Sequence, residues 1–417
     1  MVKDVYVIGV FSTRFKKWPE KSNKELARDA LVGVLNDAGV DTGEKIENAY
    51  FSNCGMGLIW DQDLVRGHCT FAPLVEEGLF PERVPIINVE GACASGSMAF
   101  HLAWKDILSG VHEVSLAFGL DKFYHKDMDK VMLAFEHGID REDKDRLVSE
   151  YETIAAECGR EYKQLPGHTI FMDTYAMQAC WHMWKHGTTR EQIAVGASKN
   201  HYHGFLNPKA QYRFEVPVEK VLADYEVSYP LTRSMCAPIG DGAAAAILCS
   251  EAFFKTLPPS VKQRAVKVSA SVMSSGKHRH ISEPGESRWA ADRAYKMAGI
   301  GPEQISVAEV HDATSFCEIY QAEMLGFCPE GQGGSFIASG ATMLDGKIPI
   351  NTSGGLVSKG HPIGATGLSM IYEITTQLRG EAGPRQIKNA VYGLTENGGG
   401  VISADEMTCG ITILKRQ

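Results

Sequence analysis

The same order of predicted strands, helices and turns occurs twice along this chain of 417 residues. Each half begins with a β-branched strand pattern, a helix pattern, a glycine-containing turn and a second strand. These elements lie at residues 4–12, 22–38, 39–45 and 46–52 in the first half, and at 265–271, 286–298, 299–303 and 306–311 in the second. In both turns a glycine follows the helix directly, as is usual where a helix stops. The repeat predicts that one α/β unit is present in two copies.

Both halves continue in parallel after these four elements. In each, a short apolar segment leads into small residues, a helix with an apolar stripe and two closing strands. In the first half these elements lie at residues 85–89, at 91–96, in a helix ending at 109, and at 114–118 and 242–249. In the second half they lie at 348–351, at 354–361, in a helix ending at 379, and at 389–393 and 410–415. Strands that alternate with helices predict α/β layers around a partly parallel sheet. We therefore expect two duplicated, layered α/β halves that pack together, with functional residues at their junction.

Residues 121–229 interrupt the first half and do not follow the repeat. Their pattern is charged and helical, and a long insertion of this kind is suited to cover a ligand cleft. We therefore divide the chain into a first half at 1–120 and 230–255, an inserted loop domain at 121–229, and a second half at 256–417.

Charge and cysteine usage exclude several classes of protein. The chain has 42 Lys and Arg against 51 Asp and Glu, a net charge of −9, and so lacks the basic excess of a nucleic-acid binder. No run of 18 apolar residues occurs, and we expect no membrane-spanning helix. Ten cysteines occur without a CxxC pair, which argues against zinc sites and disulfides and predicts a reducing, cytoplasmic location and no bound metal.

Cys93 lies between a predicted strand and a predicted helix, within residues 91–96 (GACASG). Backbone N–H groups and the positive end of the helix dipole lower the pKa of a thiol at such a position, which favours a nucleophilic thiolate. A buried structural cysteine at a tight turn is the alternative. His361 occupies the corresponding place in the second half, so the repeat predicts that the two helix starts face each other and form a thiol–imidazole pair. The other interpretation of His361 is a residue that caps a glycine-rich turn.

Two further segments follow strands of the second half. His311 and Asp312 come after the apolar residues 307–310, at the end of a strand where catalytic groups gather in α/β sheets. A buried, hydrogen-bonded histidine is the alternative. Residues 395–400 (TENGGG) follow the predicted strand 389–393, and their glycines suit an oxyanion hole or a flexible turn. Neither a P-loop nor a dinucleotide-binding GxGxxG after the first strand is present, so nucleotide-driven chemistry is not expected.

In combination these segments resemble the thiolase superfamily, and within it the sterol-carrier-protein type of thiolase. The matching motifs lie at residues 88–96, 199–201, 206–208, 241–245, 309–312 and 354–367. Each motif is weak alone, but their order along most of the chain is specific. The resemblance is greatest to the thiolase subunits of benzoylsuccinyl-CoA thiolases, which serve anaerobic toluene degradation.

The resemblance implies a role for each matching residue. Cys93 corresponds to the nucleophile that becomes acylated, and His361 to the histidine that activates it and helps to hold a thioester oxygen. His311 takes the place of an oxyanion-hole asparagine or histidine, and the backbone N–H groups of Cys93 and Gly398 correspond to a second oxyanion hole. The resemblance also implies a homodimer, coenzyme A as a substrate with no permanently bound cofactor, and cleavage of a 3-oxoacyl-CoA into two acyl-CoA products.

The chain departs from the family pattern at the second catalytic cysteine. Glu396 and Ala313 occupy the two positions where thiolases carry this acid/base, which leaves His311, Cys317 and Glu396 as candidate proton carriers. Thiolase-like chains with such departures work with a small companion protein, an OB-fold with a zinc ribbon, so we expect a partner of this kind. The alternatives to a thiolase are a retro-aldolase acting on an acyl-CoA side chain, a non-catalytic scaffold subunit and a cysteine hydrolase.

Overall fold

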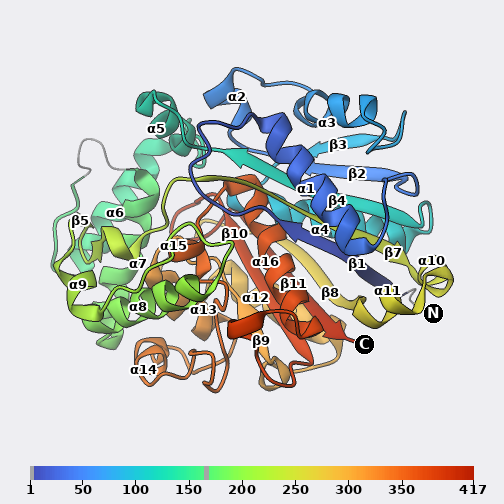
Figure 1. The fold of residues 1–417 in the computed structure, drawn as a ribbon. Coiled ribbons are helices and arrows are strands. Elements are labelled where there is room, and N and C mark those ends of the chain that lie inside the picture. The colour runs from blue at the N-terminus through green and yellow to red at the C-terminus, as the bar shows by residue number, and fades with distance from the viewer. Residues whose placement is uncertain (1–3, 164–168) are drawn as a thin grey trace.

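The computed structural model describes residues 4–163 and 169–417 and shows a nine-stranded mixed sheet flanked by helices (Figure 1). The strands of this sheet are β1 (Val5–Ser12), β2 (Asn48–Ser52), β3 (Ile86–Val89), β4 (Val114–Lys122), β7 (Asp241–Ser250), β8 (Val266–Ser275), β9 (Val307–Glu309), β10 (Tyr392–Gly399) and β11 (Thr408–Arg416). Two short strands, β5 (Glu226–Ser228) and β6 (Leu231–Thr232), form a separate sheet. The predicted first half and insertion include residues 1–3 and 164–168, which lie outside the described residues.

Helices surround the sheet and make up most of the inserted region. The α-helices are α1 (Asn23–Ala38), α2 (Met56–Trp60), α3 (Arg66–Glu76), α4 (Ser95–Ser109), α5 (Met128–Glu136), α6 (Lys144–Glu157), α7 (Ile170–His186), α8 (Arg190–Leu206), α9 (Val218–Ala223), α10 (Glu251–Thr256), α11 (Pro259–Arg264), α12 (Glu286–Ala298), α13 (Ser315–Met324), α14 (Gly333–Ala338), α15 (Gly355–Lys359) and α16 (Ile363–Arg379). Single 3₁₀ turns are η1 (Ala92–Ala94), η2 (Arg233–Met235), η3 (Pro302–Gln304) and η4 (Gly383–Arg385). The matched turns of the repeat are present, because Gly39 and Gly299 end α1 and α12 with φ values of 74° and 68°.

The sheet confirms the duplication in its strand order. Reading inward from one edge the order is β3-β2-β4-β7-β1, and reading inward from the other it is β9-β10-β11-β8, with corresponding strands in corresponding places. β1 and β8 join the two series through the antiparallel pairs Tyr6↔Lys267 and Val7↔Val266. The counterpart of β3 is reduced, because residues 348–351 contribute only the parallel bridge Ala308↔Ile350.

One predicted boundary is wrong. Residues 395–400 are expected to follow a strand at 389–393 as an oxyanion hole or a flexible turn, but β10 spans Tyr392–Gly399, so residues 395–399 lie within the strand. It pairs along its length with β11, with Glu396 opposite Ile411 and Gly398 opposite Cys409. The expected flexible turn is therefore excluded, since tertiary pairing overrides the local preference of glycine.

The central layer consists of α4 and α16, which pack against each other and contact strands of both halves. Their predicted apolar stripes, which include Ala103 and Ile107 on α4 and Leu368 and Ile374 on α16, meet in one hydrophobic core cluster. α1 covers the outer face of the first half and α12 that of the second. The layered arrangement places the N-terminal ends of α4 and α16 close together, at the junction of the halves (Figure 1).

Helices α5 to α9 of the inserted region lie to one side of the sheet (Figure 1). Within the described part of the chain, residues 123–240 contribute no strand to the nine-stranded sheet. Their apolar side chains, such as Tyr151 and Phe171, join a core cluster that also contains Phe316 of α13. Among residues 4–163 and 169–417 no helix is long and apolar enough to cross a membrane.

Candidate active site

Cys93 sits in a strained turn between β3 and α4. The preceding residue, Ala92, has a φ of 46°, a left-handed conformation that costs a non-glycine residue of order 1 kcal/mol. Ser95 holds this turn, because its hydroxyl accepts from the Gly91 N–H at 2.9 Å and donates to the Ala92 carbonyl at 2.6 Å. The Cys93 side chain lies at the wall of a cavity and is 8% exposed. Small residues around it leave room for a ligand carbonyl.

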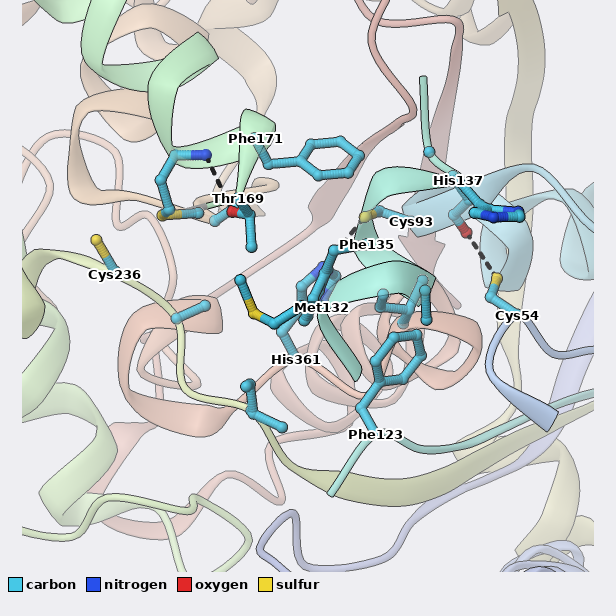
Figure 2. A pocket seen from close by; sticks show the side chains of 18 of the residues that line it. Cys54, Cys93, Phe123, Met132, Phe135, His137, Thr169, Phe171, Cys236 and His361 are labelled. Atoms are coloured by element: carbon cyan, nitrogen blue, oxygen red, sulfur yellow. Dashed lines mark hydrogen bonds between the residues drawn. The ribbon is translucent and has the colours of Figure 1, made fainter. Parts of the chain in front are cut away.

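His361 lies between α15 and α16 and points its ring at this thiol. Its Nε2 is 3.2 Å from Cys93 Sγ, and its Nδ1 is 2.7 Å from the Thr366 hydroxyl (Figure 2). Thr366 donates its single hydroxyl proton to the Pro362 carbonyl at 2.9 Å, so it must accept from Nδ1–H. This assignment places the proton of the neutral ring on Nδ1 and leaves Nε2 free to accept the proton of the thiol. The predicted thiol–imidazole contact is therefore present.

The resting thiol is protonated, contrary to the prediction of a lowered pKa. Burial raises the pKa of Cys93 to about 12, and the carboxyls of Glu406, Asp121 and Glu90 add to this shift. Burial likewise holds the pKa of His361 well below its usual value, assisted by His311 and Lys359. The helix start is too weak to reverse these effects, since a helix dipole is worth about 1 kcal/mol. Cys93 and His361 thus rest as a neutral pair.

His311 follows β9 and completes the group around the thiol. Ligand atoms of Cys93, His311 and His361 all lie within 4.8 Å of one another, and the rings of the two histidines are 5.3 Å apart. The His311 side chain is 2% exposed, and its Nε2 has no hydrogen-bond partner among the described residues. Burial lowers the pKa of His311 to about 4. A buried, neutral imidazole with an unused nitrogen is suited to bind an oxygen of a ligand.

Glu396 lies behind His311 rather than at the cavity wall. Its carboxylate accepts the His311 backbone N–H at 2.9 Å. Carboxyl oxygens of Glu396 and Glu406 and the Cys409 sulfur lie within 4.8 Å of one another. Burial raises the pKa of Glu396 to about 7, and burial together with Glu396 raises that of Glu406. Two buried carboxyls this close favour sharing one proton, as neighbouring like charges disfavour double ionisation.

The other two predicted site residues occupy less direct positions. Cys317 is buried in α13, where its sulfur is 3.4 Å from the Thr314 hydroxyl, and burial raises its pKa to about 12. Gly398 lies in β10 with the Glu406 carboxyl directly against its Cα. Neither residue lines the cavity that contains Cys93. The next glycine is required for close packing, because a Cβ on Gly399 would lie 2.9 Å from the Cys93 nitrogen and 2.3 Å from the Gly91 carbonyl.

Cys93 and His361 open onto a cavity of about 480 Å³ at the junction of the two halves and the insertion (Figure 2). Its lining is mostly apolar and includes Phe123, Met132, Phe135, Phe171, Tyr175 and Ile363. Among the described lining residues none is Lys or Arg. Apart from Cys93 and His361, sequence reasoning singled out none of these side chains, since an isolated aromatic residue in a helical insertion has no local signature of a ligand contact.

Asp121 is a further residue that sequence reasoning missed, because it falls where the predicted insertion begins. It lies at the end of β4 and accepts backbone N–H groups of Cys54, Gly55 and Gly364 at 3.1, 2.7 and 2.6 Å. These bonds tie the cavity wall at Cys54 to the first turn of α16, next to His361. Asp121 therefore holds both sides of the site in place.

Comparisons with known proteins show which family this chain is similar to. The model of the thiolase N-terminal domain matches residues 5–229, and that of the thiolase C-terminal domain-like family matches residues 271–414. An acetyl-CoA acetyltransferase of Methanothermobacter thermautotrophicus is 36% identical over 404 residues, covering 96% of this chain and 97% of the relative. The benzoylsuccinyl-CoA thiolase subunit BbsB of Thauera aromatica is 30% identical over 392 residues, covering 93% and 92%. Among solved structures, the Ltp2-ChsH2(DUF35) aldolase shares the fold, with a TM-score of 0.76 at 20% identity over 99% of this chain and 98% of that one.

Proposed function

This chain belongs to the thiolase family and is an acyltransferase, and from that premise we propose that it cleaves a 3-oxoacyl-CoA with free coenzyme A through an acyl group on Cys93. The observation that carries the proposal is the 3.2 Å contact between Cys93 Sγ and the unprotonated Nε2 of His361, at the wall of a ligand-sized cavity. Thiol and base must be in contact for proton transfer to accompany attack, because the resting thiol is neutral.

In the first step, His361 Nε2 takes the Cys93 proton as the sulfur attacks the keto carbon of the substrate. The backbone N–H groups of Cys93 and Gly398 are assigned to the resulting oxyanion, and each such donor lowers the barrier by about 3–4 kcal/mol. The carbon–carbon bond then breaks, which leaves the acyl group on Cys93 and releases the enolate of an acyl-CoA. We assign the enolate oxygen to the imidazoles of His311 and His361.

The enolate carbon must then receive a proton. Of the three candidates we assign this role to Glu396, since its pKa, raised by burial to about 7, allows both the protonated and the ionised form near neutrality. The Cys317 thiol, with a pKa raised to about 12 by burial, is much less suited to exchange protons at that pH. Coenzyme A completes the cycle: its thiol proton restores Glu396, its sulfur takes the acyl group from Cys93, and His361 returns its proton to the Cys93 sulfur. The protein supplies all these groups itself, and coenzyme A enters as a substrate.

The test is to trap the acyl-enzyme. Incubating the protein with a 3-oxoacyl-CoA while withholding free coenzyme A should add the mass of the acyl group to the Cys93 peptide. In the Cys93→Ser variant this mass shift should be absent, because a serine hydroxyl is a weaker acid than a thiol and a poorer nucleophile when His361 takes its proton. Carbon–carbon cleavage without label on Cys93, and without any need for coenzyme A, would favour a retro-aldolase instead.

For the substrate we propose benzoylsuccinyl-CoA as the first compound to test, with benzoyl-CoA and succinyl-CoA as products. The support is the 30% identity to a benzoylsuccinyl-CoA thiolase subunit over 93% of this chain. Faster turnover of acetoacetyl-CoA than of any aryl substrate would overturn this assignment and leave the proposed reaction standing.

For the assembly we propose a homodimer that binds a small OB-fold subunit with a zinc ribbon. β3 forms one edge of the sheet, and its Ile87 side chain is 41% exposed, so a second copy has a strand to pair with. Support for a companion protein comes from two similar proteins: BbsB is a subunit of its thiolase, and the Ltp2-ChsH2(DUF35) aldolase is named for two components. We also propose that the chain divides into a first half at 1–120 and 230–255, an inserted loop domain at 121–229 and a second half at 256–417. The proposed partner subunit would be contradicted if the lone chain were fully active and no small protein co-eluted with it from the native host.

A further inference from the structure

The surroundings of the Cys93 sulfur are apolar on the side where an acyl group would be attached. Cys93 belongs to a small hydrophobic cluster with Ile59, Phe123 and Ile363, and Phe135 packs against this cluster. The rings of Phe123 and Phe135 are 5.3 Å apart and tilted by 40°, and both line the cavity (Figure 2). We call Phe123, Phe135 and Ile363 the acyl wall. It offers dispersion contacts and no hydrogen-bond donor to a charged group.

The lining beside this wall does not favour an anion. Glu90 lines the cavity, no described lining residue is Lys or Arg, and Asp121 lies buried behind Cys54. Burial raises the pKa of the Cys93 thiol and nearby carboxyls add to that shift, so the site disfavours a negative charge on this sulfur. A further anion placed beside Cys93 would lose its hydration without gaining a counter-charge, which is strongly unfavourable in a buried site.

The size of the cavity argues against a very small acyl group. Its volume of about 480 Å³ must hold the acyl group and the end of the coenzyme A arm. For scale, an apolar cavity of about 150 Å³ binds a benzene ring. An acetyl group on Cys93 would leave the acyl wall largely without contacts, whereas a ring or a branched chain could cover it.

We propose that the acyl wall selects an uncharged, bulky apolar acyl group, aryl or branched alkyl, for transfer to Cys93 and rejects acyl groups that end in a carboxylate. This inference rests on the proposed function, because it concerns the group that Cys93 accepts. It goes beyond that function by assigning specificity to Phe123, Phe135 and Ile363. The wall acts through shape and the absence of a cation rather than through any group that takes part in bond making.

The first test uses acyl transfer from simple thioesters. In this half-reaction the bond between the acyl carbon and the coenzyme A sulfur breaks, a bond to Cys93 Sγ forms, and the Cys93 proton passes through His361 to the coenzyme A thiolate. The probes are 4-methylpentanoyl-CoA and succinyl-CoA, in which an isopropyl group replaces a carboxylate of nearly the same shape, together with benzoyl-CoA, acetyl-CoA and the methyl ester of succinyl-CoA. The rate of label on the Cys93 peptide is followed by mass spectrometry on the full-length wild-type protein.

We expect 4-methylpentanoyl-CoA and benzoyl-CoA to label Cys93 at least about 100-fold faster than succinyl-CoA, with the uncharged methyl ester recovering much of the difference. Labelling by succinyl-CoA as fast as by 4-methylpentanoyl-CoA would overturn the inference and leave the proposed function intact. Failure of every probe to label Cys93 would instead contradict the proposed function. The two failures are therefore distinguishable.

The second test changes the wall. Phe135→Ala should slow labelling by 4-methylpentanoyl-CoA by about 10-fold or more while changing labelling by acetyl-CoA less than about twofold. Phe135→Leu keeps most of the apolar volume, so it should slow labelling by 4-methylpentanoyl-CoA less than Phe135→Ala does. Phe214→Ala is the matched control, since Phe214 is 50% exposed and lies outside the cavity lining. An equal loss with both thioesters in Phe135→Ala would show that Phe135 supports the fold and not specificity.

Discussion

Corresponding helix starts in the two halves carry complementary chemistry. In the first half β3 pairs with β2 over four residues and leads directly into the turn of Cys93. In the second half the counterpart of β3 forms only the bridge between Ala308 and Ile350, and α15 is interposed before His361. Since α4 and α16 pack side by side, these two departures from the same unit bring a thiol and an imidazole into contact. Duplication thus provides the layout, and local divergence provides the two halves of one catalytic pair.

The surroundings of the two helix starts also differ. Around Cys93 the first half and the insertion present apolar side chains, such as Phe123. Around His361 and His311 the second half is held by buried polar contacts: Asp312, next to His311, accepts the Leu356 N–H at 2.6 Å and an amide N–H of Asn200 at 2.8 Å. One side is therefore shaped to receive a ligand, and the other to fix the orientation of the two imidazoles.

The largest effect should come from breaking the contact between the halves. His361→Ala removes the base on the second half and leaves the thiol of the first half neutral, so acylation of Cys93 should slow by at least about 100-fold. Rapid-quench mass spectrometry of the Cys93 peptide measures this rate. His101→Ala is a histidine control on α4, outside the lining of the cavity. A loss of less than about threefold would argue that Cys93 is not activated by His361.

A second prediction separates proton transfer from acylation. Glu396→Gln should slow exchange of the α-proton of an acyl-CoA by about 100-fold and leave acylation of Cys93 nearly unchanged. Proton abstraction needs the ionised carboxylate, and burial raises the pKa of Glu396 to about 7, so the wild-type exchange rate should rise with pH through that value. Deuterium incorporation measured by NMR reports the rate.

The rival candidate for this role provides the control. Cys317→Ala should leave α-proton exchange within about twofold of wild type, because burial raises the pKa of this thiol to about 12 and leaves it protonated near neutrality. If Cys317→Ala abolished exchange while Glu396→Gln did not, the assignments of the two residues would be reversed.

A smaller effect should follow from loosening His361 without removing it. Thr366→Val keeps the shape of the side chain but deletes the hydroxyl that accepts from His361 Nδ1–H. One hydrogen bond is worth about 1 kcal/mol, so acylation should slow by about fivefold through loss of the productive tautomer and orientation. Ser369→Ala, on the same helix, is a hydroxyl deletion without contact to His361. Equal effects of both changes would indicate that the helix itself, and not the tautomer, was disturbed.

The smallest effect concerns stability and involves one histidine from each half, the half-buried His101 and the buried His311. Burial lowers the pKa of both His101 and His311 to about 4, so between about pH 6.5 and 4 the unfolded chain binds more protons than the folded one. These two histidines therefore contribute stability that is present near neutral pH and is lost on acidification through this window, whereas the buried carboxyls with raised pKa values, such as Glu396, contribute in the opposite sense. Urea unfolding from pH 7 to 5 tests this, and His101→Gln should reduce the slope. His280→Gln, which changes an exposed histidine, should leave the slope unchanged.

Much of the fold could be predicted because the repeat is written in local patterns. Periodicity and the glycines after α1 and α12 place most strands and helices close to their observed bounds, and the family resemblance is confirmed. The errors occur where pairing partners are remote in the chain. The segment at 395–399 is a strand because β11 pairs with it, and 348–351 hardly pairs at all, although its pattern matches that of 85–89.

The sequence by itself determined that a thiol and an imidazole stand at equivalent helix starts of a duplicated α/β unit, because both the repeat and the motifs are local. Only the tertiary structure decided the protonation state of that pair, since burial and the carboxyls of Glu406 and Asp121, from distant parts of the chain, add to nearby Glu90 and outweigh the helix start at Cys93. It alone also decided the apolar wall around the sulfur. Burial and electrostatic fields are sums over neighbours in space, and neighbours in space are not neighbours in sequence.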